Sequence, residues 1–208
     1  MRVVVGSESL RDPQQGELRR HLQMMSRCVE RAQAGFSLTM ILRSPGSDPA
    51  KALIGMKGAL QHAGVSAKVI LAWLEPEDDL KQLFASLSEL APQEPASELI
   101  RWARNPRLLD AHEQVTYGET MCWSGDAMRR DADRRNALTL FDEEAPDTAR
   151  LGRLAFGALW AVSALVPERR LLGTLTARPS GAYEQAPETP VAVSTLRQSL
   201  QTWPLVRH

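Results

Sequence analysis

The sequence has few of the residues on which disulfide frameworks and metal sites depend. It contains two cysteines, Cys28 and Cys122, and four histidines among its 208 residues. Both cysteines occupy positions expected in the core and lack metal-ligand spacing, so we expect free thiols and a reducing, cytoplasmic environment. No two histidines have ligand spacing, and His21 and His62 are expected on helix surfaces. The sequence therefore predicts no metal site and no cofactor.

The chain also lacks an excess of charge and a long apolar run. Lysine and arginine together number 25, as do aspartate and glutamate, so the formal net charge is zero. Any attraction to nucleic acid or to a membrane must then come from a local patch. The longest apolar run, Leu154 to Val166, is interrupted by Ser163 and is too short to span a bilayer. It is typical of a buried core helix, and the N-terminal residues do not resemble a signal peptide.

Hydrophobic periodicity predicts helices that alternate with strands. Helices are expected at residues 17–34, 48–63, 77–90 and 147–165, and strands at residues 3–5, 36–42, 66–74, 98–104, 112–118, 119–125 and 137–141. Such alternation predicts an α/β fold with a mixed β-sheet sandwiched by helices. This domain is expected to cover residues 1–166. Residues 167–208 are rich in Pro, Ser, Thr and Gly and are expected to form a C-terminal tail with one short helical pattern.

Two common catalytic motifs are absent. The segment "GMKG" at residues 55–58 falls inside an expected helix and lacks the spacing of a phosphate-binding loop. The segment "CWSGD" around Ser124 does not have the G-x-S-x-G pattern of a serine hydrolase. A P-loop nucleotidase and an α/β-hydrolase are therefore not supported.

The expected hairpin contains a pattern that some phosphodiester-cleaving enzymes use. His112 is followed by Gln114 and Glu119, and further along by Asn136. With the helices and strands that precede it, the span from Gln33 to Leu165 resembles one half of the phospholipase D superfamily, also called the HKD family. That family has H-x-K-x4-D, then G-S-x-N, then N-x-E. The resemblance implies a phospholipase D-like fold.

The match to the family motif is partial. His112 and Asn136 match the histidine and the second asparagine, and Glu119 replaces aspartate conservatively. Gln114 replaces the lysine, and Ser124 to Ala127 falls at the G-S-x-N step without its asparagine. The resemblance therefore implies a degenerate site formed by these residues.

The missing lysine matters chemically. In the family, the histidine attacks phosphorus, while lysine and asparagine stabilise charge on the phosphate oxygens. Gln114 can donate a hydrogen bond but brings no charge, and loss of one such donor costs roughly 10²–10³ in rate. The resemblance also implies a homodimer, because a chain with one motif needs a second copy to supply a second histidine.

Four arginines follow the hairpin, interspersed with aspartates: Arg129, Arg130, Arg134 and Arg135. One interpretation is a solvated loop with internal ion pairs. The alternative is a rim that binds a phosphate-containing ligand or nucleic acid by its backbone, together with Arg101, Arg104 and Arg107.

Three hypotheses about function follow. The first is a phospholipase D-like protein with a degenerate site and a non-catalytic or structural role. The second is an active homodimeric phosphodiesterase or nuclease that uses His112. The third is a nucleic-acid-binding module that uses the arginine-rich rim.

Overall fold

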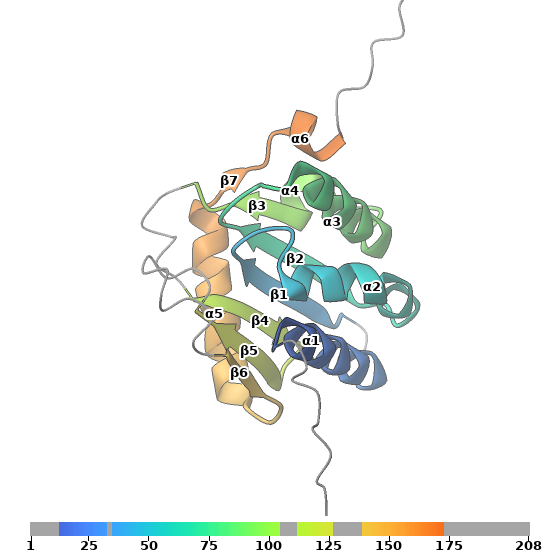
Figure 1. Cartoon of the computed structure of the whole chain (residues 1–208), viewed down its shortest axis with the longest axis vertical. Helices are drawn as coiled ribbons and strands as arrows, with labels where there is room; N and C mark the ends of the chain where they lie inside the picture. The colour runs from blue at the N-terminus through green and yellow to red at the C-terminus, as the bar shows by residue number, and fades with distance from the viewer. Residues whose placement is uncertain (1–12, 33–34, 105–111, 127–138, 173–208) are drawn as a thin grey trace, which may run out of the picture. The chain divides into compact units, whose positions relative to one another are not determined.

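The fold is taken from a computed structural model, which describes residues 13–32, 35–104, 112–126 and 139–172 (Figure 1). These residues form an α/β unit around a mixed sheet of seven strands in the order β6-β5-β4-β1-β2-β3-β7. The helices are α1 (Pro13–Glu30), α2 (Asp48–His62), α3 (Glu77–Leu90), α4 (Ala96–Leu99), α5 (Pro146–Val162) and α6 (Glu168–Leu172). The strands are β1 (Ser37–Leu42), β2 (Ser66–Leu71), β3 (Ile100–Trp102), β4 (Glu113–Tyr117), β5 (Met121–Gly125), β6 (Thr139–Asp142) and β7 (Ala164–Leu165).

The predicted α/β class, with a mixed sheet between helices, is confirmed. Helices α2 and α3 and the hairpin lie within two residues of the expected bounds. Helix α1 begins and ends four residues earlier than expected, and α5 ends three residues earlier than expected. The segment expected as a strand at residues 98–104 begins with the short helix α4 and is extended only from Ile100. The strand expected at residues 3–5 lies outside the described residues.

One half of the sheet is parallel because each strand is followed by a helix that returns the chain. β1 pairs with β2, and β2 pairs with β3, all in parallel. Helix α2 begins as its sequence predicts, with Pro49 in its first turn, although the N-cap is Ser47 and not Asp48. It ends at His62 with Ala63 as the C-cap, and the next residue, Gly64, has a φ of 69°, which favours glycine.

The other half is antiparallel. β4 pairs with β1, β5 with β4, and β6 with β5. Gly118 forms the turn between β4 and β5 at a φ of 70°, a conformation that L-residues rarely adopt. A side chain there would also collide with the ring of Phe36, which packs directly against this turn.

The two faces of the sheet are covered differently (Figure 1). Helices α1, α2 and α3 lie on one face, and α5 lies alone on the other. The main core fills the first face and includes Met25, Leu38, Leu53 and Leu83, all of which are fully buried. The second cluster is smaller and consists of Ile41, Ile70, Ala72, Ala103 and Phe156.

The expectation that residues 154–165 form a buried helix is wrong. Leu154 is 60% exposed and Val162 is 68% exposed, while Phe156 is only 6% exposed. Helix α5 therefore packs a single face on the sheet. In the part of the chain that the structure describes, no helix has both the length and the apolar character needed to cross a membrane.

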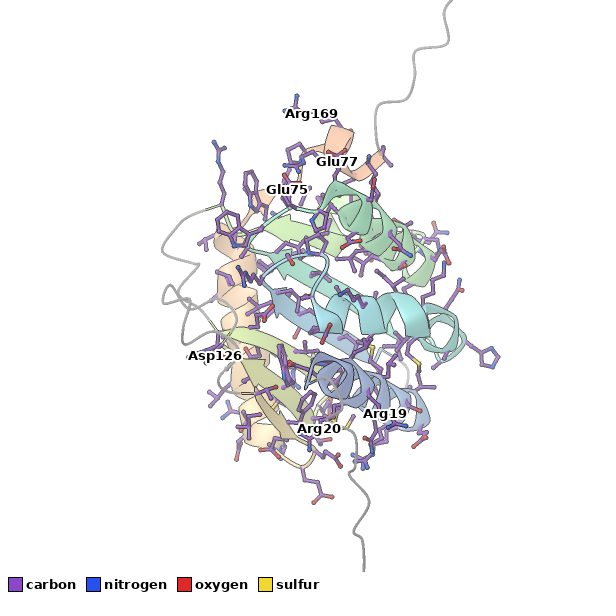
Figure 2. All side chains as sticks on the ribbon, viewed as in Figure 1. Arg19, Arg20, Glu75, Glu77, Asp126 and Arg169 are labelled. Carbon is purple, nitrogen blue, oxygen red and sulfur yellow. The ribbon has the colours of Figure 1, made fainter. Side chains whose placement is uncertain are left out.

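The packed region continues past the boundary expected after residue 166. Helix α6 follows Pro167, and its Leu171 is only 4% exposed and belongs to the main core. Figure 2 shows Glu75 and Glu77 beside this helix, where Arg170 Nη2 lies 2.5 Å from Glu75 Oε1. The remaining residues of the expected tail lie outside the described ranges.

Both cysteines are buried and free, as predicted. Burial raises the pKa of Cys28 to about 12, so its thiol stays protonated at neutral pH. The same cause raises the pKa of Cys122. Neither has the properties of a reactive thiolate.

Candidate functional site

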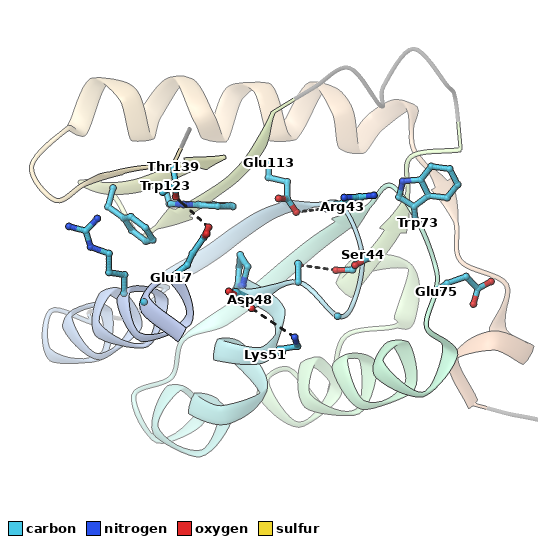
Figure 3. Close-up of a pocket in the computed structure, with 16 residues that line it drawn as sticks. Glu17, Arg43, Ser44, Asp48, Lys51, Trp73, Glu75, Glu113, Trp123 and Thr139 are labelled. Atoms are coloured by element: carbon cyan, nitrogen blue, oxygen red, sulfur yellow. Dashed lines mark hydrogen bonds and ion pairs between the residues drawn. The ribbon is translucent and has the colours of Figure 1, made fainter. Parts of the chain in front are cut away.

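A pocket of about 950 Å³ opens where the parallel strands β1 and β2 end (Figure 3). The loops after these strands form one wall, and the first turn of α2 forms another. Helix α1 and strands β4, β5 and β6 complete the lining. The carboxyl ends of parallel strands are where α/β proteins most often bind ligands, because neighbouring loops diverge there.

Glu113 is the most deeply placed acid of this pocket. It opens β4, is only 3% exposed, and its Oε1 accepts a 2.7 Å hydrogen bond from the backbone N–H of Arg43. Burial raises the pKa of Glu113 to about 7, the Arg43 N–H opposes this rise, and the charges of Glu17 and Asp48 add to it. A carboxyl of this kind exchanges its proton near neutral pH.

A chain of polar contacts joins the opposite wall. Trp123 Nε1–H donates to Thr139 Oγ1 at 2.7 Å, and that hydroxyl donates to Glu17 Oε1 at 3.4 Å. The indole of Trp123 and the ring of Phe141 lie in the same wall. Glu17 therefore faces the pocket next to a broad aromatic surface.

His21 lies behind this wall and is completely buried, so the expectation that it lies on a helix surface is wrong. Its ring meets Trp123 edge-on at 4.6 Å, and Nδ1 hydrogen-bonds to the Tyr117 hydroxyl. Burial raises the pKa of Tyr117 and lowers that of His21, so the phenol keeps its proton and the imidazole is neutral. His21 Nε2 makes no hydrogen bond in the described chain and lies 3.8 Å from Glu17 Oε1.

Three cationic side chains line the pocket. Arg20 lies over the Phe141 ring, 5.2 Å from its centroid, and Lys51 Nζ is 3.9 Å from Asp48 Oδ1. Figure 3 shows the third, Arg43, between Glu113 and Trp73. All three basic side chains are more exposed to solvent than the Glu113 carboxyl.

The structure separates the residues of the predicted degenerate motif. His112 is exposed, directly precedes β4 and does not line the pocket. Glu119 is exposed in the turn after β4, so the whole strand of five residues separates it from His112. At about 3.3 Å per residue, this strand is roughly 16 Å long, so the two residues lie beyond its opposite ends.

Gln114 lies on the sheet face that α5 covers. A Cβ added at Gly152 of α5 would meet the Gln114 amide and would lie 2.9 Å from Thr116 Cγ2. Ser124 is the β5 partner of Gln114 and shares that face. Neither residue lines the pocket.

The other predicted site residues lie outside the described residues or away from the pocket. Asn136 and the arginine-rich rim, Arg129, Arg130, Arg134 and Arg135, belong to a range that the structure does not describe, as does Arg107. Of the upstream arginines, Arg101 packs 5.0 Å from the Trp160 ring centroid and Arg104 lies 5.7 Å from that of Trp102. Within the described ranges, no group of histidine, cysteine, aspartate and glutamate side chains is arranged to hold a metal ion.

Sequence reasoning missed Glu113, which lies between the two motif positions. Successive residues of a strand face opposite sides, so a search for His112 and Gln114 overlooks the acid between them. The available signal was a lone carboxylate at the start of a strand whose other inward residues, Val115 and Tyr117, are apolar.

Comparisons with known proteins leave the site to be interpreted from its own geometry. No family model matches the chain, and neither the curated proteins nor the solved structures give a match.

Proposed function

We propose that this protein is a non-catalytic, phospholipase D-like binding protein whose pocket takes a small ligand with a positively charged amine. The observation that carries the proposal is the buried Glu113 carboxyl, which lines the pocket. The degenerate hairpin motif and the order of the elements support the phospholipase D-like part.

The lining of the pocket supports a role without catalysis. Its described residues include no histidine or cysteine. The hydroxyls of Ser47 and Thr139 are already engaged, with the Ser44 carbonyl and the Glu17 carboxylate respectively. Covalent phosphodiester cleavage needs a nucleophile beside the bound phosphorus, with a base or donors around it. Ser44 also lines the pocket, but the described lining holds no histidine to act as its base.

The charges deep in the pocket favour a cation. The negative charges of Glu17 and Asp48 raise the pKa of Glu113, which means that they repel its ionised form. An ammonium group placed between Glu113 and Glu17 would remove this repulsion and form charge-assisted hydrogen bonds. A phosphate at the same point would meet three carboxyl groups. The rings of Trp123 and Phe141 would contact the apolar part of an amine ligand.

Two probes with the same ring and opposite charge test this proposal. Calorimetry at pH 8 should detect binding of benzylamine and no binding of phenyl phosphate. Glu113→Gln should weaken benzylamine binding by about tenfold or more, because it removes one charged partner. Glu119→Gln, an exposed acid at the far end of β4, is the matched control and should leave binding unchanged. Preference for phenyl phosphate would overturn the ligand class.

An activity assay tests the non-catalytic part separately. The wild type should not hydrolyse bis(p-nitrophenyl) phosphate above the buffer rate. Hydrolysis that disappears in His112→Ala would instead establish the phosphodiesterase hypothesis.

A further inference from the structure

The outer side of α5 presents an apolar surface, here called the α5 stripe: Leu151, Leu154, Ala155, Ala158, Ala161 and Val162. The three large members are 59%, 60% and 68% exposed in chain order, and the alanines are exposed as well. The only charged residue between Leu151 and Leu165 is Arg153, and its guanidinium is turned toward the hairpin, donating to the Gly118 carbonyl at 2.7 Å. About three helical turns therefore expose no charge along this stripe.

The stripe is symmetric about Ala158. Ala155 and Ala161 lie three residues to either side of it, and Leu154 and Val162 lie four residues to either side. Two copies of α5 packed antiparallel across a two-fold axis at Ala158 would place alanine against alanine and Leu154 against Val162. An interface of this type must be complementary to itself, and this pattern satisfies that condition.

The sizes of the side chains fit the same arrangement. Small residues at the centre let two helix backbones approach closely, and the larger residues on either side can then fill the space beyond them. Leu165, which follows the helix and is 57% exposed, extends the apolar surface at the end opposite Leu151. A partner of strong charge is disfavoured because the stripe offers it no ion pair, whereas a second copy brings the same uncharged surface.

We propose that the α5 stripe is the interface of an antiparallel, two-fold symmetric homodimer of this chain, with Ala158 at the axis. This dimer does not depend on the ligand pocket, which lies on the opposite face of the sheet from α5. A contact made mainly by one helix pair belongs to the small class of interfaces, so we expect a dissociation constant on the order of micromolar.

A cysteine at the axis gives the sharpest test. Ala158→Cys should form a disulfide-linked dimer under mild oxidation, because equivalent residues at the axis of such a pair are close enough for an S–S bond. The wild type should not cross-link, since Cys28 and Cys122 are buried. Ala85→Cys, an exposed alanine on α3, is the matched control and should remain a monomer on denaturing gels.

Sedimentation over a range of concentrations provides a second measurement. The wild type should change from monomer to dimer, and Leu154→Glu should shift the dissociation constant at least tenfold toward the monomer. Leu172→Glu, at a leucine that is 62% exposed on α6, should have no effect. A wild type that is monomeric at several hundred micromolar, or a dimer that Leu154→Glu leaves intact, would overturn the proposal. Resistance of the Ala158→Cys thiol to alkylation in the monomer would also overturn the proposal, because it would mean that another part of the same chain covers the α5 stripe.

Discussion

The two faces of the central sheet receive different protection from the same chain. Leu38, Met40 and Leu42 of β1 are fully buried in the main core beneath α1, α2 and α3. Ile41 of the same strand belongs to the small cluster beneath α5. On the first face, apolar side chains of the sheet pack against apolar side chains of α1, α2 and α3. The second face is covered by α5 alone. The apolar side chains of the sheet beneath α5 are buried, but large apolar side chains on the outer side of α5 remain exposed to solvent.

The same substitution on the two faces should give the largest difference. Leu53 of α2 is fully buried and Leu154 of α5 is 60% exposed. Leu53→Ala should lower the free energy of unfolding by about 2–5 kcal/mol, because it removes buried methyl groups and leaves a cavity. Leu154→Ala should change it by less than about 0.5 kcal/mol in dilute, monomeric protein. Urea denaturation of both variants measures the contrast.

A large loss for Leu154→Ala in dilute protein would contradict this comparison. It would mean that the outer side of α5 is covered within one chain.

The next effect belongs to the pocket on the first face and depends on pH. The native state holds the Glu113 proton up to a pKa of about 7, against an ordinary value of 4.5. The native state therefore binds more protons than the unfolded state between these values, and stability falls as pH rises through them. The full loss is about 3 kcal/mol and is complete above pH 7. Glu113→Gln should remove this loss, making the variant more stable than wild type at pH 8 and similar at pH 4.5.

Thermal or urea unfolding at a series of pH values tests that difference. His21 acts in the opposite direction, because burial lowers its pKa and the unfolded state gains its proton first as pH falls. The contribution of His21 to the free energy of unfolding is present above pH 6.5 and is lost as the pH falls below that value. This loss is the same in the wild type and in Glu113→Gln, so it cancels when their stabilities are compared. Equal free energies of unfolding for the wild type and Glu113→Gln at pH 8 would contradict the prediction, because they would show that ionisation of Glu113 does not destabilise the native state.

Two glycines of α5 distinguish the inner side of the helix from its outer side. Gly152 faces β4, where an added Cβ would lie 2.9 Å from Thr116 Cγ2, whereas a Cβ at Gly157 would meet nothing within 4 Å. Gly152→Ala should destabilise by about 1–3 kcal/mol through overpacking. Gly157→Ala should stabilise by about 0.5–1 kcal/mol, since alanine is the better helix former. Denaturation midpoints of the two variants should therefore move in opposite directions.

Much of the fold could be predicted because its local signals agree with one another. Pro49 and Gly64 delimit α2, and the apolar run of residues 66–74 predicts a buried parallel strand. The environment of His21 was missed, although His21, Met25 and Cys28 share one side of α1 at steps of four and three residues. The polarity of His21 favours a surface position, but its spacing from Met25 and Cys28 indicates the buried side of the helix.

The site and the outer side of α5 could not be predicted in the same way. Strand alternation places Glu113 opposite Gln114, but which side faces a pocket depends on the loops after β1 and β2. Those loops are distant from Glu113 in sequence. An apolar run such as that of α5 is compatible with burial on all sides or on one, and only the neighbouring elements decide between them.

The position of β1 has a consequence for the order in which the chain can fold during synthesis. Its pairing with β2 joins segments separated only by α2, so this half can form early. The other edge of β1 pairs with β4, which is synthesised much later. Thr116 of β4, the partner of Thr39 in β1, lies 77 residues further along the chain. Until then β1 presents open backbone groups and apolar side chains, the features of a strand that pairs with other chains. A nascent chain that stalls before Tyr117 would therefore keep this edge of β1 unpaired and be prone to aggregate.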